Sequence, residues 1–257
     1  KDAKFIVPPD RPFFEPLTSL AFLAGCTDRI QLGMSVMVLP YRHPLYWAKI
    51  VATLDHLSTG RFILGVGVGW MSEEFDALGA AFAERGKVSD EQLRLLDALW
   101  SDEHVSFSGR YYRFYDIAFS PKPFNRSRIP IWIGGEGKPA QRRAGIYGDA
   151  WFPYFVSITP RELAARFEYV RRTARDAGRD PERVGLACCL PIELTEVDVP
   201  QREDYLSGSP GQIATALKRF ERAGVQHIGL QFMIPHWPER RAQIERFARE
   251  VLPEFKS

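Results

Sequence analysis

The chain has 257 residues, of which 45% are hydrophobic and 26% are charged, and its formal net charge is +2. This composition is typical of a globular protein with a sizeable core, and barrels of alternating strands and helices reach this length as one domain, so we expect a single domain over residues 1–257. The balanced charge gives no reason to expect nucleic acid or an anionic membrane as a partner, and no apolar run is long enough to span a bilayer.

Cysteine and histidine usage excludes several kinds of site. The three cysteines are Cys26, Cys188 and Cys189, and an odd number with two adjacent fits neither a disulfide framework nor a metal site. No motif has the spacing of a zinc site or of a catalytic triad, so no metal site is predicted. We expect reduced, buried thiols and hence a cytoplasmic protein.

The first half of the chain alternates helices with apolar strands. Residues 15–24 predict a short helix, residues 30–39 a strand, and Pro44–Leu57 a helix that opens on a proline. A buried strand begins at Phe62, because an apolar run bounded by glycines is typical of a strand covered on both faces. Two helices follow at residues 71–84 and 90–99, with a break near Gly86. A hairpin is then predicted at residues 105–114.

The second half resumes the alternation with a strand at residues 129–133. Two of its helices are expected to begin with a capping box, at residues 159–162 and 209–212. Strand then helix recurs six times along the chain, which indicates a parallel sheet covered by helices. The other predicted elements are strands at Ala150–Phe152, 184–194 and 228–232 and a last helix at residues 239–251.

Two α/β architectures accommodate six strand–helix units. One is a doubly wound open sheet. The other is a closed (β/α)8 barrel, which needs eight strands and so requires two more units before Lys1. Six strands in an open barrel would leave two apolar edges unpaired, which proteins avoid. The start on a helix with no preceding strand favours the barrel, with its N-terminal βα units missing from this chain and the hairpin as an insertion.

Two glycine-rich stretches lie where a strand gives way to a helix. Gly65, Gly67 and Gly69 either allow close packing or form the floor of a site for a flat cofactor, and their spacing does not fit a dinucleotide fingerprint. Residues 134–137 are either an ordinary turn or an anion site, since their N–H groups would open a helix. Among five histidines, only His43 follows a strand at the end where barrel chemistry occurs, so it is the candidate acid or base.

Several motifs taken together resemble the bacterial luciferase-like superfamily, and most closely its branch that uses the deazaflavin coenzyme F420. As a set they cover nearly the whole chain. The motifs are Leu54-Asp55-x-Leu57-Ser58-x-Gly60-Arg61-x-x-Leu64-Gly65-Val66-Gly67-x-Gly69-Trp70, Glu73-Glu74-Phe75, Ser35-Val36-x-x-Leu39-Pro40-x-Arg42-His43-Pro44, Ala83-Glu84-Arg85-Gly86, Pro121-Lys122-Pro123, Pro130-Ile131-Trp132-Ile133-Gly134-Gly135 and Asp149-x-Trp151-Phe152-Pro153.

The resemblance implies a TIM barrel, a homodimer, a small-molecule substrate and a deazaflavin. It also implies a non-proline cis peptide between Ser35 and Val36, beneath the cofactor ring. By motif, residues 67–70 would lie beside the ring and residues 134–137 would hold the phosphate. The cofactor-binding residues implied in this way are Ser35, Val36, Gly67, Val68, Gly69, Trp70, Gly134, Gly135, Glu136 and Gly137.

Two departures from the family pattern bear on the chemistry. The histidine or acid that relatives place after the second strand would lie before Lys1, which leaves His43 as the candidate among the residues present. Trp70 occupies the position of an acid in the glucose-6-phosphate dehydrogenase branch, and a tryptophan cannot transfer a proton. We expect instead a nonpolar, aromatic substrate pocket formed by Tyr41, Trp70 and the hairpin.

The sequence thus predicts a coenzyme F420-dependent oxidoreductase that transfers a hydride between the deazaflavin and an organic substrate. One alternative is an FMN-dependent monooxygenase on the same barrel. The second alternative is a non-catalytic flavin-binding or scaffold protein, which would be favoured if no titratable residue faced the ring.

Overall fold

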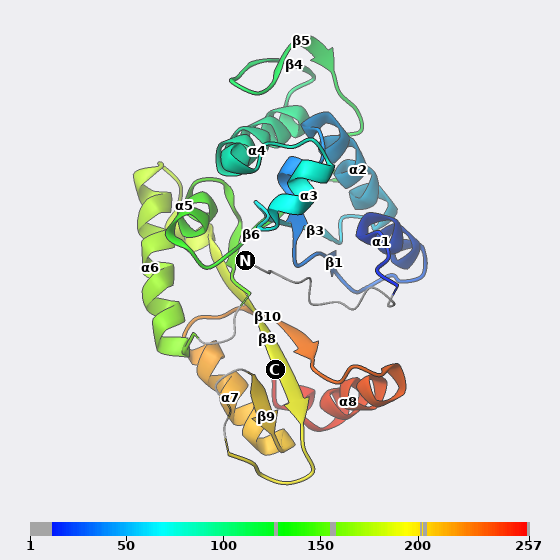
Figure 1. The fold of residues 1–257 in the computed structure, drawn as a ribbon, viewed down its shortest axis with the longest axis vertical. Helices are drawn as coiled ribbons and strands as arrows, with labels where there is room; N and C mark the ends of the chain where they lie inside the picture. The colour runs from blue at the N-terminus through cyan, green and yellow to red at the C-terminus, as the bar shows by residue number, and fades with distance from the viewer. Residues whose placement is uncertain (1–11, 126–127, 155–157, 201, 203–204, 256–257) are drawn as a thin grey trace. The chain divides into compact units, whose positions relative to one another are not determined.

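A computed structural model describes residues 12–125, 128–154, 158–200, 202 and 205–255. The chain divides into two compact units, Lys1–Trp132 and Ile133–Ser257. Each unit contains parallel strands and helices that alternate along the chain (Figure 1), as the sequence predicts. A single domain over residues 1–257 stays a prediction.

The strands of the first unit form a small parallel sheet. Strand β3 (Phe62–Gly67) is its longest member, and its first five residues are buried, in agreement with the apolar run in the sequence. Strand β1 (Leu32–Gly33) pairs with the start of β3 and strand β2 (Met37–Val38) with its end. The segment between β1 and β2 therefore passes beside the middle of β3.

Helices surround this sheet (Figure 1). Helix α1 (Pro16–Gly25) packs against α2 (Pro44–Leu57), and α2 packs against α4 (Arg85–Ser101). The core between them includes Trp47 of α2, which is completely buried. Its indole N–H donates a hydrogen bond of 2.9 Å to the carbonyl of Leu39. The ring is therefore buried without leaving its polar group unpaired.

Two predictions for this unit are wrong in detail. The predicted strand at residues 30–39 is interrupted between β1 and β2, because the backbone of Met34 turns toward β3 and lies against Gly65. The predicted helix at residues 71–84 is divided into α3 (Ser72–Ala77) and a short helical turn, η2 (Phe82–Glu84), and α4 begins at Arg85 and includes Gly86. The start of α4 is fixed by Arg85, whose guanidinium donates to the carbonyl of Phe82 at 2.9 Å.

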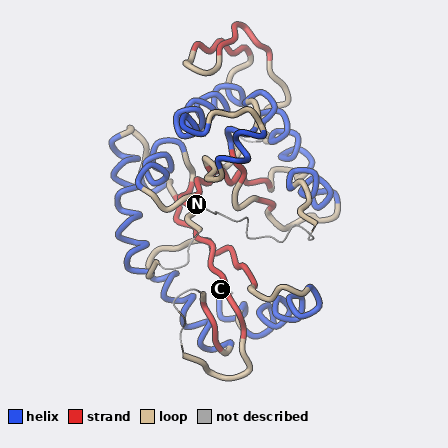
Figure 2. Tube along the Cα trace, in the orientation of Figure 1, coloured by secondary structure: helices blue, strands red, loops and turns tan. Residues whose placement is uncertain are grey.

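The predicted hairpin is present as β4 (His104–Ser108) and β5 (Arg113–Ala118), paired antiparallel. Figure 2 shows its two strands beyond the helices of the unit. The turn is held by the buried carboxylate of Glu91 on α4, which accepts hydrogen bonds of 2.8–2.9 Å from three consecutive N–H groups at residues 110–112. One side chain of α4 thus accepts hydrogen bonds from three consecutive backbone N–H groups of the turn.

The second unit is built around one long strand, β8 (Gly185–Leu194). Strand β7 (Ala150–Phe152) pairs with the start of β8, and β10 (His227–Phe232) runs along six of its residues. Strand β9 (Leu206–Gly208) pairs with the end of β8, and all three neighbours are parallel to it. The sequence did not predict β9. Strand β6 (Ile131–Gly134) spans the boundary between the two units.

Four helices accompany these strands: α5 (Lys138–Tyr147), α6 (Pro160–Asp176), α7 (Pro210–Arg222) and α8 (Trp237–Glu250). Helices α6 and α7 begin with the two predicted capping boxes, in which each cap hydroxyl accepts from the backbone three residues on. Helix α5 packs against α6, and α7 packs against β9. None of the helices in the described part of the chain is long and apolar enough to cross a membrane.

The cysteines divide into two groups. Cys188 and Cys189 lie on β8 and are buried, as expected. Burial raises the pKa of the Cys188 thiol to about 12, so it stays protonated and unreactive at neutral pH. The expectation of burial is wrong for Cys26, which is exposed because it caps the C-terminal end of α1.

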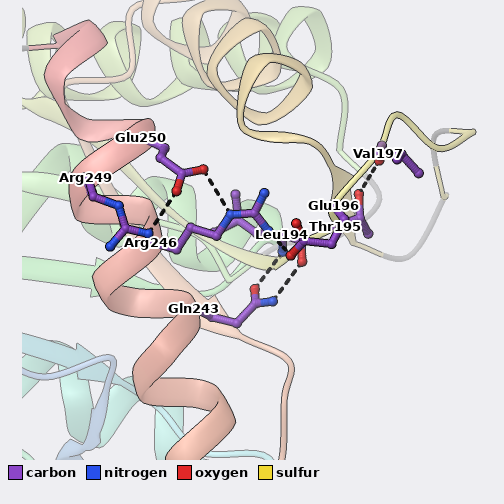
Figure 3. A network of polar contacts seen from close by, with 8 residues as sticks. All are labelled: Leu194, Thr195, Glu196, Val197, Gln243, Arg246, Arg249 and Glu250. Carbon is purple, nitrogen blue, oxygen red and sulfur yellow. Dashed lines mark hydrogen bonds and ion pairs between the residues drawn. The ribbon is translucent and has the colours of Figure 1, made fainter.

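Helix α8 is attached to the end of β8 by polar side chains (Figure 3). The amide of Gln243 donates to the carbonyl of Leu194 at 2.7 Å and accepts from its N–H at 2.7 Å, as a neighbouring strand would. One turn further on, Arg246 contacts Glu196 at 2.8 Å, but the Glu196 side chain is 88% exposed. Because exposed ion pairs contribute little, the amide pair provides most of this attachment.

We expect Gln243→Ala to lower the free energy of unfolding of the second unit by about 2 kcal/mol, since two hydrogen bonds to buried backbone groups are lost. Urea denaturation followed by circular dichroism would measure the change. Glu245→Ala, on an exposed position of the same helix, is the control and should stay within about 0.5 kcal/mol of the parent. Equal stability of the two variants would show that the attachment does not depend on Gln243.

Candidate functional site

The first unit contains a pocket of about 600 Å³ beside the segment that joins β1 to β2. Most of the described residues that line it are apolar, which is typical of sites for small organic molecules. The lining comprises Phe13, Phe14, Pro16, Ser19, Leu20, Gly33, Met34, Ser35, Val36, Met37, Val38, Tyr41, Arg42, Trp70 and Glu74.

The pocket wall between β1 and β2 lies very close to β3. A β-carbon on Gly65 would be 1.7 Å from the carbonyl oxygen of Met34, a separation that only glycine avoids. The peptide bond between Ser35 and Val36 is cis, as the family resemblance implied. The glycine at position 65 is therefore required for close packing of two backbone segments, and this packing supports the wall that Met34, Ser35 and Val36 provide.

The loop after β3 carries Trp70, whose side chain is 56% exposed and lines the pocket. Arg85 contacts the backbone of this loop, because its side chain donates a hydrogen bond of 3.2 Å to the carbonyl of Gly69. The Arg85 guanidinium also lies 3.9 Å from the centre of the Phe82 ring. Phe82 in turn packs edge-on against buried Phe75, with 5.2 Å between ring centres. The backbone just before Trp70 is thus held by Arg85, which packs on Phe82.

Tyr41 and Glu74 form a polar corner of the pocket. The phenol of Tyr41 donates a short hydrogen bond to the carboxylate of Glu74 on α3. Burial, and then this bond and the negative charge of Glu74, raise the pKa of the Tyr41 hydroxyl, which therefore stays protonated at neutral pH. Arg42 forms an ion pair with Glu15 at 3.0 Å.

The residues predicted to bind cofactor or substrate lie in different parts of the structure. Ser35, Val36, Tyr41 and Trp70 lie together around the pocket. Gly67, Val68 and Gly69 belong to β3 and the loop after it, and they are not among the described residues of the lining, nor is any residue of the hairpin. A contribution of the hairpin to the substrate pocket stays a prediction, and its two strands pair with each other.

His43 is the N-cap of α2. Its ring accepts from the N–H of Leu45 at 3.3 Å and packs edge-on against Tyr112 with ring centres 5.2 Å apart. Partial burial lowers its pKa, so the ring is neutral at pH 7. His43 is not among the described lining residues, and an acid–base role for it stays a prediction.

Residues 134–137 lie in the second unit, between the end of β6 and the start of α5. Gly135 has a φ of +104°, which only glycine adopts readily, and its carbonyl accepts from the indole of Trp151 at 2.8 Å. The carbonyl of Glu136 accepts from the side chain of Gln141 at 2.7 Å. These two hydrogen bonds hold the turn before α5, and phosphate binding there stays a prediction.

Sequence reasoning assigned no role to Glu74 or Arg42. Glu74 was visible only as part of a family motif, and its partner Tyr41 lies 33 residues earlier in the chain. The sequence offered one signal for Glu74: it is an acidic residue shortly after the glycine-rich end of a buried strand. No group of three or more potential metal ligands occurs among the residues that the structure describes.

The sequence of this chain matches the luciferase-like monooxygenase family over residues 3–196. A phthiodiolone/phenolphthiodiolone dimycocerosates ketoreductase from Mycobacterium kansasii is 35% identical over 260 residues, which cover 95% of this chain and 69% of that protein.

Solved structures share the fold at low sequence identity. An F420-dependent secondary alcohol dehydrogenase in complex with an F420-acetone adduct superposes with a TM-score of 0.82 at 20% identity, over 97% of this chain and 86% of that chain. A long-chain alkane monooxygenase superposes with a TM-score of 0.80 at 16% identity, over 95% of this chain and 73% of that chain.

These similarities decide between the two architectures. The alternation of parallel strands and helices is that of the luciferase-like (β/α)8 TIM barrel, with the hairpin as an insertion, and the doubly wound open sheet is not supported. The chain belongs to the luciferase-like monooxygenase family and is an enzyme of that family.

Proposed function

We propose that this protein is a coenzyme F420-dependent oxidoreductase that transfers a hydride between the deazaflavin and a small organic substrate with a carbonyl or hydroxyl group. The observation that carries the proposal is the pocket of the first unit, with its mainly apolar lining and the polar corner formed by Tyr41 and Glu74. The ketoreductase relative and the F420-dependent alcohol dehydrogenase neighbour support chemistry at a carbon–oxygen bond.

The residues present fit such a cofactor. When bound, the deazaflavin supplies or accepts the hydride, and the protein orients it and excludes water. Met34, Val36 and Trp70 offer apolar and aromatic surface to a flat ring. Binding of a phosphate by the N–H groups of residues 134–137 is a separate proposal for the second unit.

Two further expectations remain part of the proposal. The first is a homodimer, which the family resemblance implies. The second is a cytoplasmic location, which the free thiols are consistent with.

Titration with coenzyme F420 and with FMN, followed by visible absorbance and fluorescence, tests the proposal. We expect F420 to bind, and Trp70→Ala to weaken that binding about tenfold, because an aromatic contact of roughly 1.5 kcal/mol is lost. Trp237→Ala is the matched control, since this tryptophan is 63% exposed but lies on α8 in the second unit. Its affinity for F420 should equal that of the parent.

The same titration separates the alternatives. Tight binding of FMN without binding of F420 would replace the proposal by an FMN-dependent monooxygenase, and one solved neighbour is named as an alkane monooxygenase. Binding of neither would favour a non-catalytic scaffold. The hydrogen-bonded pair of Tyr41 and Glu74 in the pocket argues against a scaffold, because titratable side chains in a pocket are typical of functional sites.

A further inference from the structure

The polar corner of the pocket carries one more inference, which rests on the proposed function. We propose that Tyr41 and Glu74 form a two-step proton relay: the phenol oxygen of Tyr41 contacts the substrate oxygen, and Glu74 exchanges the proton with Tyr41. Tyr41 is then the catalytic residue, and Glu74 acts through it as a positioning residue and terminal proton acceptor.

The geometry places the two groups in series. Tyr41 closes the short helical turn η1 (Leu39–Tyr41) after β2, and Glu74 lies on α3 after the Trp70 loop. Both side chains line the pocket and the phenol donates to the carboxylate. The Tyr41 ring also packs edge-on against Phe75, with 5.0 Å between ring centres, which fixes the direction of its hydroxyl.

The other charged group of the lining does not compete for this carboxylate. Among the described lining residues the charged side chains are Arg42 and Glu74. Arg42 is paired with Glu15 at 3.0 Å, and its guanidinium lies 5.2 Å from the centre of the Trp47 ring. Glu74 is therefore the acidic group of the pocket that remains available to take a proton from Tyr41.

Hydride transfer at a carbon–oxygen bond requires a proton to move at the oxygen. In the oxidation of an alcohol, the C–H bond breaks and its electron pair leaves with the hydride to the oxidised deazaflavin, while the C=O bond forms. The hydroxyl proton passes to the Tyr41 oxygen and the phenol proton passes to the Glu74 carboxylate. In the reduction of a ketone every transfer is reversed, and solvent reprotonates Glu74.

The raised pKa of Tyr41 fits this role. A free tyrosinate is disfavoured in the corner because of burial and the neighbouring carboxylate. Tyr41 can therefore give up its own proton only as it receives another. This condition is met by a relay in which one oxygen accepts from the substrate while it donates to Glu74.

A binding experiment without cofactor tests the first step. Decan-2-ol is a suitable probe, since it combines an apolar chain with one secondary hydroxyl. By isothermal titration calorimetry we expect Tyr41→Phe to weaken its binding about tenfold, because the hydroxyl loses its acceptor. Tyr46→Phe, an exposed tyrosine on α2, is the matched control and should bind like the parent. Equal affinity of Tyr41→Phe and the parent, including no binding by either, overturns the relay.

The second step is tested by the rate of F420 reduction with decan-2-ol. We expect Tyr41→Phe and Glu74→Gln each to lower the rate about a hundredfold with unchanged F420 affinity, and the double variant to be no slower than Tyr41→Phe alone, because the groups act in series. Glu73→Gln, an exposed neighbour on α3, should retain the parental rate. Multiplying effects in the double variant would overturn the series arrangement.

These two arms separate the relay from the proposed function. If the parent fails to bind F420 but Tyr41→Phe still loses affinity for decan-2-ol, the cofactor assignment is wrong and the alcohol site at Tyr41 stands. If F420 binds and is reduced equally fast by Tyr41→Phe and the parent, the cofactor assignment stands and the relay is wrong.

Discussion

Gly65→Ala is expected to lower the free energy of unfolding of the first unit by roughly 3 kcal/mol and to abolish binding in the pocket. The new methyl carbon would lie 1.7 Å from the oxygen and 2.8 Å from the carbon of the Met34 carbonyl. Both are backbone atoms, so no side-chain rotation relieves the overlap and the segment between β1 and β2 must move. Urea denaturation and calorimetry with decan-2-ol would measure the two losses on the same preparation.

Gly25→Ala provides the control for this prediction. A β-carbon on Gly25, the last residue of α1, would meet no atom within 4 Å, so this variant should be at least as stable as the parent. If Gly65→Ala behaved like Gly25→Ala and still bound the probe, the wall of the pocket would not depend on the close approach of Met34 to β3.

Glu91→Gln is expected to destabilise the first unit by about 2–3 kcal/mol, although it changes the side-chain volume very little. Three backbone N–H groups at residues 110–112 donate to this carboxylate, whose residue is only 3% exposed. An amide presents an NH₂ group in place of one oxygen, so at least one of these donors would face another donor. Hydrogen exchange should show faster exchange at residues 110–112 before any change elsewhere.

Glu103→Gln is the matched control, because Glu103 is an exposed acid next to the same hairpin. It should leave both the stability and the exchange of the turn unchanged. Unaltered protection of residues 110–112 in Glu91→Gln would mean that the hairpin turn is stable without the carboxylate.

Elements with local determinants could be predicted from the sequence. Helices α6 and α7 begin where their capping boxes indicated, because cap and partner are only three residues apart. Helix α2 has the predicted bounds, fixed by a proline at its start and an apolar stripe along its length. The interruption of the predicted strand at residues 30–39 has no local signal, since its cause is the approach of Met34 to a glycine 31 positions later.

The candidate site was predictable in part for the same reason. Trp70 and Tyr41 could be assigned to a pocket because each follows a strand at the same end of the sheet. The hydrogen bond between Tyr41 and Glu74 depends on where α3 ends and on how Phe75 packs against the Tyr41 ring. The sequence shows neither of these. The direction of the His43 side chain was equally hidden, because it is set by the first turn of the helix that it caps.

The position of β8 in its sheet has a consequence for how the second unit is made during translation. Its residues 186–192 are all buried, and a largely apolar strand with unpaired edges can pair with other chains, although Pro191 removes one N–H donor from it. Both edges are closed in the folded protein, one by β7 and β9 and the other by β10. Because β9 and β10 lie later in the chain, β8 leaves the ribosome before its partners, and its adjacent thiols and apolar side chains stay exposed to aggregation until residue 232 has followed.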